Sequence, residues 1–509
     1  FRVIFKAFKS AKKAKQLRTT DVDTLMALDD DEFFDSIEIL CEDSVIDISD
    51  KDVPIEQKYV YSLLQFVSEV NNGGLCQFFV NSSRSLAPYI EDNLNKIGAT
   101  EHKKIFTEFI ENTSFAPIQQ TEEWTKLKAN WKNSFCGIYK DDTLCGIALI
   151  LIRTLMPGFN YAYCPRGPIM DLTDSEMVKA FVDGAKQFCK SRNIYLLKTD
   201  PAIVVNKILP DIPVDKFFDP FDLERGKVEF DTLVNNGFEH KGFVKNLGEA
   251  IQPRFNALIP LKDANGKPLT APEFKKNYKQ KIRKYLGNFQ PARGLFYEGA
   301  QHTSENIALF KKILSNTEAR QQISLRNEEY FSILADAFGD KAFFAFERCN
   351  VNTYIENLEK RYEKELDMRE KITEQIADAK KVLSERGEIV PLAALLTVYP
   401  PNKTGVRIAE YLYAGSDLNV FPSFCATLCG LCEQCILTTE NGCDFLDLGG
   451  IAGTLDDGLY EFKSQFNPII IEYAGEFDLK VNSFKYNLME KGLPILKKSY
   501  MKLRRLIKR

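Results

Sequence analysis

No run of apolar residues in this 509-residue sequence is long enough to cross a membrane. The longest, CGIALILI at residues 145–152, is far shorter than the roughly 18 residues that span a bilayer. Residues 1–18 carry seven basic side chains and no acid, and lack the apolar block and small-residue cleavage site of a secretory signal. We therefore expect a cytoplasmic protein without a transmembrane helix.

Histidine is scarce, which bears on the class of chemistry. The three histidines are His102, His240 and His302, and none stands in a phrase typical of a serine or cysteine nucleophile. Each is expected at a surface or cap. The sequence thus argues against a nucleophilic triad.

A phosphate-binding loop is also lacking. The glycine-rich stretch GGIAG at residues 449–453 is not followed by Lys-Ser or Lys-Thr, and no clear helix begins on it. We interpret it as a turn. The missing pyrophosphate loop also argues against coenzyme A as a substrate.

Cysteine is present twelve times, and five of the twelve lie between residues 425 and 443. Their Cys-x2-Cys-x2-Cys spacing occurs in iron–sulfur ligation. The same stretch, FCATLCGLCEQCILTT, also predicts one helix with a buried cysteine stripe. We favour reduced, buried thiols and expect no metal site.

Charge is distributed unevenly along the chain, although the formal net charge is only −4. Residues 267–293 carry eight basic side chains and one acid, and residues 485–509 carry nine and one. Such segments suggest a polyanionic partner such as phosphate groups or RNA. The alternative is a solvated, lysine-rich face.

The first hundred residues form a predicted unit of their own. Residues 21–56 hold fourteen acids against one lysine, and the following EQKYVYSLLQFVSEVNNGGLCQFFVNSS has helical periodicity. This phrase resembles uncharacterised bacterial domains related to DNA-mimic proteins. The resemblance implies a small, acidic, helical accessory domain at 1–103, with a protein as its partner.

The rest of the chain repeats one pattern. NSFCGIYKDDTLCGIALILIRT predicts a β-hairpin, followed by the strand YAYCP, the helix SEMVKAFVDGAKQFCKSRN and the strand IYLLKTDP. AALLTVYP and GVRIAEYLYAGS predict a second hairpin, followed by the cysteine-rich helix and the strand CDFLDLGG. This order predicts an α+β protein with two copies of an acyltransferase-like domain.

Residues 355–386 separate parts of the second copy. Apolar residues there recur at spacings of three and four in a highly charged background. A coiled-coil-like arm is predicted, either as a hairpin bent near 367–373 or as part of a longer helix.

Several motifs in this order resemble the FemABX family of peptidoglycan bridge aminoacyltransferases, including its MurM-like members. They are QQTEEWTKLK (119–128), YCPRGPIMDL (163–172), QPRFNALIPL (252–261), YLYAGS (411–416), LDLGGIAG (446–453), GLYEFKSQF (458–466) and EYAGEFDL (472–479). The resemblance implies GNAT-like (acyltransferase-like) subdomains at 104–265 and 266–509, with the antiparallel arm inserted in the second.

The resemblance also implies a reaction. An aminoacyl group would pass from aminoacyl-tRNA to the stem-peptide lysine of a peptidoglycan precursor, either lipid II or a UDP-linked muropeptide. Aminoacyl-tRNA would be a co-substrate, and no cofactor is expected. The enzyme would work in the cytoplasm, with peripheral contact at the inner face of the membrane as a further expectation.

Residue roles follow from the motifs. Catalytic roles are implied for Lys463, Glu476 and Phe462, and substrate-binding roles for Trp124, Lys128, Arg166, Lys279, Arg283 and Tyr473. Trp124 and Lys128 would flank the mouth of the precursor site, and Arg283 would bind phosphate bidentately. Arg166 either binds substrate or fixes a rigid turn between two prolines.

The chemistry needs alignment and charge stabilisation rather than a covalent intermediate, because an aminoacyl ester is already activated. Lys463 is our candidate for stabilising charge at the ester. Glu476 would position an amine or take its proton. The structural alternatives are a solvated helix lysine and a strand-end carboxylate facing water.

Two other functions compete with this hypothesis. One is an N-acyltransferase of the same fold that uses coenzyme A or acts on protein N-termini. The other is a non-catalytic interaction protein built around the acidic first domain. A transfer assay with aminoacyl-tRNA and acyl-coenzyme A as alternative donors separates them.

Overall fold

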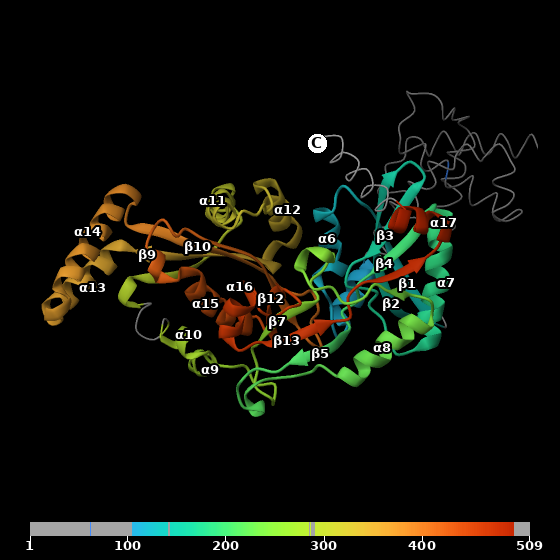
Figure 1. Cartoon of the computed structure of the whole chain (residues 1–509), viewed down its shortest axis with the longest axis horizontal. Helices are drawn as coiled ribbons and strands as arrows, with labels where there is room; N and C mark the ends of the chain where they lie inside the picture. The colour runs from blue at the N-terminus through green and yellow to red at the C-terminus, as the bar shows by residue number, and fades with distance from the viewer. Residues whose placement is uncertain (1–61, 63–103, 141–142, 285, 287–290, 493–509) are drawn as a thin grey trace, which may run out of the picture. The chain divides into compact units, whose positions relative to one another are not determined.

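The computed structural model describes residue 62 and residues 104–140, 143–284, 286 and 291–492. The chain divides into two compact units, Phe1–Ile105 and Phe106–Arg509, and the second contains every element labelled in Figure 1. The predicted acidic domain at 1–103 lies almost wholly outside the described residues, as does the basic end of the chain beyond residue 492.

The first sheet of the second unit has six strands in the order β1-β2-β3-β4-β14-β6 (Figure 1). Their bounds are β1 Lys132–Lys140, β2 Thr143–Met156, β3 Phe159–Cys164, β4 Ile194–Thr199, β14 Phe477–Lys480 and β6 Glu239–His240. Strands β1 to β3 form an antiparallel meander, whereas β3 and β4 are parallel and are joined by helix α7 (Ser175–Ser191). The predicted hairpin, helix and strand are confirmed.

Successive side chains of β2 pack into two different core clusters. Ala148 and Ile150 pack in the cluster that contains the buried stripe of α7, and Leu149 packs in the cluster of Phe106 and Ile110. Successive strand residues point to opposite faces, so a near-continuous apolar run is buried on both sides.

The second sheet has eight strands in the order β5-β13-β7-β12-β11-β10-β9-β8. Their bounds are β5 Val204–Ile208, β13 Ile469–Tyr473, β7 Phe255–Pro260, β12 Phe445–Ile451, β11 Ile408–Ser416, β10 Ile389–Val398, β9 Ala342–Asn350 and β8 Leu295–Ala300. Only β11 and β12 pair in parallel within this sheet, and helix α15 (Ala426–Glu440) joins them. Each sheet therefore repeats a meander followed by a strand–helix–strand crossover.

Helices cover both faces of the second sheet. Ala394 and Leu396 of β10 share a cluster with α11 (Ser304–Gln321) and α12 (Glu328–Phe338), whereas Ala393 and Leu395 share one with α15. Apart from the two helices of the arm described below, the other α-helices are α6 Glu122–Leu127, α8 Leu223–Asn235, α9 Ala271–Asn277, α10 Gln280–Lys284, α16 Gly458–Lys463 and α17 Ser483–Tyr486. This arrangement is the predicted α+β class.

The two sheets exchange strands along the chain. β5 and β7 precede residue 265 but lie in the second sheet, and β14 follows it but lies between β4 and β6 of the first sheet. The domain boundary at residue 265 stays a prediction. Each of the two sheets contains strands from before and from after this residue.

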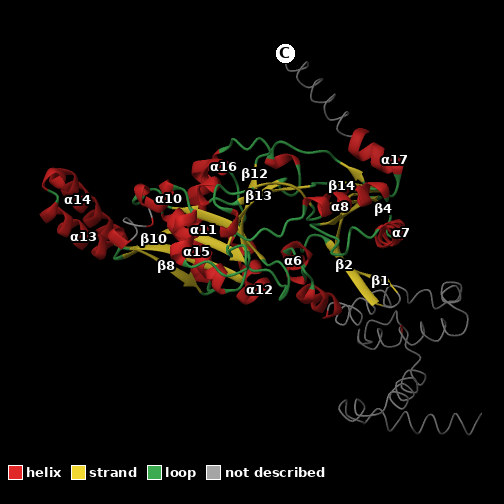
Figure 2. Cartoon of the chain, turned by 90° about the horizontal axis from the view of Figure 1, so that it is seen from below, coloured by secondary structure: helices red, strands yellow, loops and turns green. Residues whose placement is uncertain are grey.

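The predicted arm is a helical hairpin, not part of one longer helix. Helix α13 (Val351–Lys364) turns at residues 365–368 into α14 (Arg369–Arg386), and Leu358, Ile372 and Ala379 are buried along the arm. It is inserted between β9 and β10, where Asn350 and Ile389 are paired across the ladder. Both Figure 1 and Figure 2 show it extending beyond that end of the sheet.

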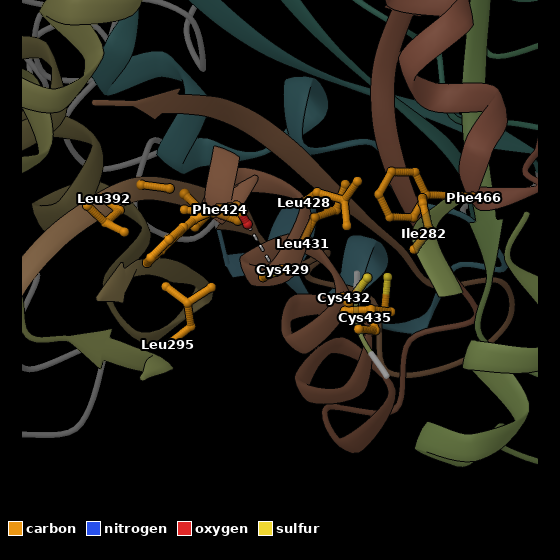
Figure 3. Packing of buried hydrophobic residues seen from close by; sticks show 14 of the residues in the cluster. Ile282, Leu295, Leu392, Phe424, Leu428, Cys429, Leu431, Cys432, Cys435 and Phe466 are labelled. Carbon is orange, nitrogen blue, oxygen red and sulfur yellow. Dashed lines mark hydrogen bonds between the residues drawn. The ribbon is translucent and has the colours of Figure 1, made fainter. Parts of the chain in front are cut away.

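The cysteine-rich segment forms α15, as its periodicity predicts. Cys429, Cys432, Cys435 and Cys443 are buried in one core cluster, where Cys432 and Cys435 lie near Leu431 (Figure 3). Burial raises the pKa of the Cys435 thiol to about 12. Within the described ranges, no group of three or more His, Cys, Asp or Glu residues could hold a metal ion. No described helix is both long and apolar enough to span a bilayer.

Candidate functional site

A cavity of about 530 Å³ lies between the two sheets. Its wall combines the loop that follows β3, the segment that follows β4, and helix α8 with the start of β11 and the end of β13. Apolar side chains such as Phe115, Ile203 and Ile408 line it together with Asp171 and Arg225. A cavity that is mostly apolar and holds a few converging polar groups is the usual form of a ligand site.

A smaller polar recess of about 40 Å³ adjoins this cavity. The two share Arg166, Ile408 and Tyr473 in their walls, so the recess is an extension of the cavity. Its own polar side chains are Gln119, Gln252, Asn256, Glu410 and Asp447. The recess is more polar than the cavity that it adjoins.

Glu410 and Asp447 lie where the parallel strands of the second sheet separate. Pairing between β11 and β12 runs through Ile408–Phe445 and Ala409–Leu446 and ends at Glu410–Asp447. Beyond this point β12 also shifts its register against β7. Two strands that part expose side chains between them, so the end of the parallel ladder creates the recess.

Two amides hold the two carboxylates. The Gln119 Nε2 donates to Glu410 Oε2 at 2.9 Å, and Asn256 Nδ2 on β7 donates to Asp447 Oδ2 at 2.6 Å. The amide oxygens of Gln119 and Asn256 are buried and have no hydrogen-bond partner among the described residues. Buried acceptors of this kind are uncommon in folded proteins, and several occur together in this recess.

Arg166 enters the recess from the first sheet. Its φ is 53°, and its backbone N–H donates to Asp200 Oδ1 at 2.7 Å. The guanidinium lies 4.0 Å from the centre of the Tyr473 ring, and Nη2 donates to the Pro253 carbonyl at 3.2 Å. Nη1 is buried without a partner among the described residues. The turn thus carries a side chain that lines the recess, and a substrate-binding role of Arg166 stays a prediction.

Consecutive glutamines join the two sheets at this site. Gln119 reaches Glu410 in the second sheet, whereas Gln120 Nε2 donates to the Pro165 carbonyl at 2.6 Å and its Oε1 accepts from Leu149 N at 2.8 Å in the first. Both belong to the short helix η2 (Ile118–Gln120). This helix fixes the spacing between the loop of Arg166 and strand β11.

Lys463 lies next to the recess. It ends helix α16, is buried, and donates from Nζ to the Gly450 carbonyl at 2.7 Å. Burial lowers its pKa to about 8, against the opposing charges of Asp447 and Asp457. The interaction with Asp447 links this predicted residue to the recess.

The carboxylates of the recess are also perturbed. Burial and the neighbouring Asp447 raise the pKa of Glu410 to about 7, although Gln119 and Arg166 act in the opposite direction. Burial likewise raises the pKa of Asp447, against hydrogen bonds from Asn256 and the Gly449 N–H. Perturbed groups that converge on one recess are typical of functional sites.

The other predicted residues lie outside the walls of the cavity and recess. Glu476 accepts from Lys198 Nζ at 2.8 Å and from Ile251 N at 2.7 Å. Phe462 packs on Phe466, with ring centres 5.7 Å apart.

The two remaining predicted pairs lie on separate elements. Lys128 Nζ lies 5.0 Å from the Trp124 ring centre, near helix α12. Lys279 N donates to the Gln465 carbonyl, which places the basic segment of Lys279 and Arg283 beside the end of α16. The structure thus unites Arg166 with Tyr473 and relates Lys463 to the same recess through the charge of Asp447.

Five polar residues of the recess were not predicted from the sequence as site residues. Gln119, Gln252, Asn256 and Asp447 lie inside motifs quoted above, and Glu410 directly precedes YLYAGS. Their signal is a polar residue within an otherwise buried strand, as in FNALIP and FLDLGG. Charged and amide side chains in such strands are seldom buried without a purpose.

Comparisons with known proteins agree with this architecture. Residues 101–378 and 365–491 match the model of the FemAB family, and residues 51–143 match that of DMP19-like protein. Lipid II:glycine glycyltransferase of Staphylococcus aureus strain MRSA252 is 25% identical over 441 residues, covering 79% of this chain and 97% of the relative. The enzyme of strain USA300 matches to the same extent. Both resemblances of the sequence are confirmed.

A solved structure shares the fold. The crystal structure of FemX superimposes with a TM-score of 0.61 at 22% identity, covering 76% of this chain and 98% of FemX. At this identity the likeness concerns the fold alone.

Proposed function

Because the chain belongs to the FemAB family, we propose that it transfers an amino acid from aminoacyl-tRNA to the stem-peptide lysine of a peptidoglycan precursor. Relatives that are lipid II:glycine glycyltransferases support this acceptor and this type of acyl group. The product would be an interpeptide bridge. The ester of the donor is already activated, so the protein needs no cofactor for the step.

The observation that carries the proposal is the polar recess at the end of the larger cavity. Its unpaired polar atoms, Arg166 Nη1 and the amide oxygens of Gln119 and Asn256, point to a ligand with both donors and acceptors. The apolar wall of the cavity suits the stem peptide that carries the amine. Alignment of two substrates in a site with little water accounts for much of the rate enhancement in such reactions.

Charge stabilisation is assigned to cations at the recess. Aminolysis of an ester develops negative charge on the carbonyl oxygen, and fixed donors at that oxygen lower the barrier. Arg166 has an unpaired Nη1, and Lys463 is held beside Asp447 by its bond to the Gly450 carbonyl. Tyr473 keeps the guanidinium in place by stacking.

The remaining predicted residues are assigned to the ends of the substrates. Lys279 and Arg283 belong to a basic segment beside α16, which suits the phosphates of tRNA or of the precursor. Trp124 and Lys128 suit a further phosphate contact. Glu476 is assigned to support of the site, since Lys198 and Ile251 already occupy its oxygens. The proposed reaction takes place in the cytoplasm, and at the inner face of the membrane when the precursor is lipid-linked.

The test compares the parent and Lys463→Met in a transfer assay. Radiolabelled aminoacyl-tRNA and a lysine-containing precursor are incubated with each protein, and acyl-coenzyme A replaces the tRNA in a parallel series. We expect a tRNA-dependent product, and a loss of roughly 10²- to 10³-fold in the variant because a charge-stabilising donor is gone.

Lys381→Met is the matched control, because this lysine is exposed on α14. Both variants should keep the circular dichroism spectrum of the parent. Turnover of Lys463→Met close to the parent's would show that the lysine is misassigned, and transfer from acyl-coenzyme A alone would refute the tRNA-dependent function.

A further inference from the structure

We propose that the polar recess binds the ammonium group of the acceptor lysine, and that Glu410 accepts the proton this amine loses before it attacks. The inference rests on the proposed function and deepens it by assigning the nucleophile's position and its base.

The recess presents hydrogen-bond acceptors. Gln119 and Asn256 each turn an NH2 group to a carboxylate, and this fixes their orientation, since a flipped amide would place oxygen against oxygen. Their oxygens are buried without a hydrogen-bond partner among the described residues, and both residues line the recess together with Glu410 and Asp447. An ammonium has three donors and no acceptor, which is the complement of this set.

Charge favours the same ligand. Glu410 and Asp447 are paired across the parallel ladder, and two neighbouring carboxylates attract a cation. Among the described residues that line the recess, Arg166 is the only cation. Its unpaired Nη1 offers a place for the carbonyl oxygen of the ester beside the amine.

Size restricts the group that can enter. The recess is small, with a volume of about 40 Å³, against about 530 Å³ for the adjoining cavity. This size favours a compact head group over a substituted phosphate or a ring. The adjoining cavity, lined by Phe115, Ile203 and Ile408, accepts the four-carbon stem of a lysine side chain.

Glu410 is better placed than Asp447 to take the proton. Both oxygens of Asp447 accept hydrogen bonds, Oδ1 from Gly449 N at 2.7 Å and Oδ2 from Asn256. Both oxygens of Glu410 also accept hydrogen bonds, but from one side-chain donor, Gln119 Nε2, which lies 3.2 Å from Oε1 and 2.9 Å from Oε2, and the Ile118 backbone donates to the same carboxylate. The charged or titratable groups that act on it are Asp447 on β12, Arg166 in the loop after β3 and Tyr473 on β13. Its pKa of about 7 suits a general base at neutral pH.

The step balances as follows. The ammonium gives one proton to the Glu410 carboxylate, and the neutral amine forms a bond from nitrogen to the ester carbon. The carbonyl regenerates as the bond to the ribose oxygen breaks, and that oxygen takes the second proton from nitrogen. Glu410 then releases its proton to water, so the net reaction yields an amide, a free hydroxyl on the tRNA and one proton.

Binding of the acceptor is tested first by calorimetry with the full chain. The probes are a soluble UDP-linked lysine pentapeptide and the same compound acetylated on the lysine side chain. We expect the parent to prefer the free amine by roughly tenfold or more, since hydrogen bonds to a charged group are lost on acetylation. Glu410→Gln should abolish the preference, whereas Glu440→Gln, an exposed position on α15, should keep it.

Single-turnover transfer between pH 6 and 9 tests the proton step. The rate of the parent should increase with pH around pH 7, as the Glu410 carboxyl group loses its proton. At pH 7, Glu410→Gln should be slower by roughly 10²- to 10⁴-fold. The deficit should narrow toward pH 9, because free amine then forms without the carboxylate. A purely structural role of Glu410 would lower the rate equally at every pH.

Two outcomes would overturn the inference. One is a Glu410→Gln protein that still prefers the free amine over the acetylated precursor and whose transfer rate still increases around pH 7. The other is a variant that loses discrimination between aminoacyl-tRNA and hydroxyacyl-tRNA but not between the two precursors, which would place the donor's α-ammonium in the recess. Failure of the proposed function is distinguishable, because the parent would then not use aminoacyl-tRNA while the calorimetry still decides what the recess binds.

Discussion

At the scale of single residues, the recess collects side chains that the surrounding strands would otherwise exclude. Glu410, Asp447 and Asn256 occupy adjacent strands of the second sheet at positions where most neighbours are apolar. A buried polar group without full hydrogen bonding destabilises the fold by roughly 1–3 kcal/mol. Their presence in the middle of a sheet indicates that these residues are kept for the site although they lower the stability of the fold.

Glu410 makes this conflict measurable. Its pKa is about 7 in the folded protein against an ordinary 4.5, so the folded state holds a proton that the unfolded chain releases between these values. The parent should therefore lose up to about 3 kcal/mol of stability as pH rises through this window. Glu410→Gln should unfold at a higher urea concentration than the parent at pH 8, and at a similar one below pH 4.5. Equal pH dependence in both proteins would show that Glu410 titrates normally.

The sequence could predict part of this site. Arg166, Tyr473 and Lys463 stand in motifs that carry a family resemblance, and the structure gathers them. Glu410 and Asp447 needed the register of a parallel ladder, which joins residues 37 positions apart that no local pattern connects. Gln119 could not be predicted either, because the sequence does not show that two consecutive glutamines face different sheets.

At the scale of elements, close backbone contact positions the cavity wall. A Cβ added at Gly226 of α8 would lie 2.0 Å from the Val204 carbonyl oxygen of β5. Both α8 and the start of β5 line the cavity. Glycine is needed here because the helix approaches the strand backbone directly.

Gly226→Ala should force α8 away from β5. We expect a loss of about 1–3 kcal/mol in the free energy of unfolding, as for other overpacked contacts. Gly184→Ala is the matched control, because Gly184 is exposed in the middle of α7 and a Cβ there meets nothing within 4 Å. That change should stabilise the protein by about 0.5–1 kcal/mol. Urea titrations of both variants decide the point, and equal midpoints would refute the proposed contact.

Periodicity was sufficient for most individual elements. The hairpin of β1 and β2, the amphipathic α7 and the cysteine-rich α15 appear where the pattern predicts them. The exchange of β5, β7 and β14 between sheets has no such signal, because strand pairing between distant segments is decided by the assembled core and not by local spacing.

At the scale of the whole molecule, the chain separates into Phe1–Ile105 and Phe106–Arg509. The FemAB match begins at residue 101, close to that division. Both sheets, the cavity and the recess belong to the second unit. The chemistry is therefore assigned to the second unit alone.

Removal of residues 1–100 should leave aminoacyl transfer measurable, because every residue of the recess remains. The transfer assay with the truncated and the full chain checks this, with circular dichroism to establish folding. Loss of all activity in a folded truncation would give the first unit a direct part in the reaction.

Strand β14 has a consequence for how the protein is made. It is the partner of both β4 and β6, yet it begins at Phe477. A ribosome that has translated the chain up to residue 476 still carries an unfinished first sheet, with the edge of β4 unpaired and open to other polypeptides. Premature termination near the 3′ end of the message would thus damage the half of the protein that was synthesised first.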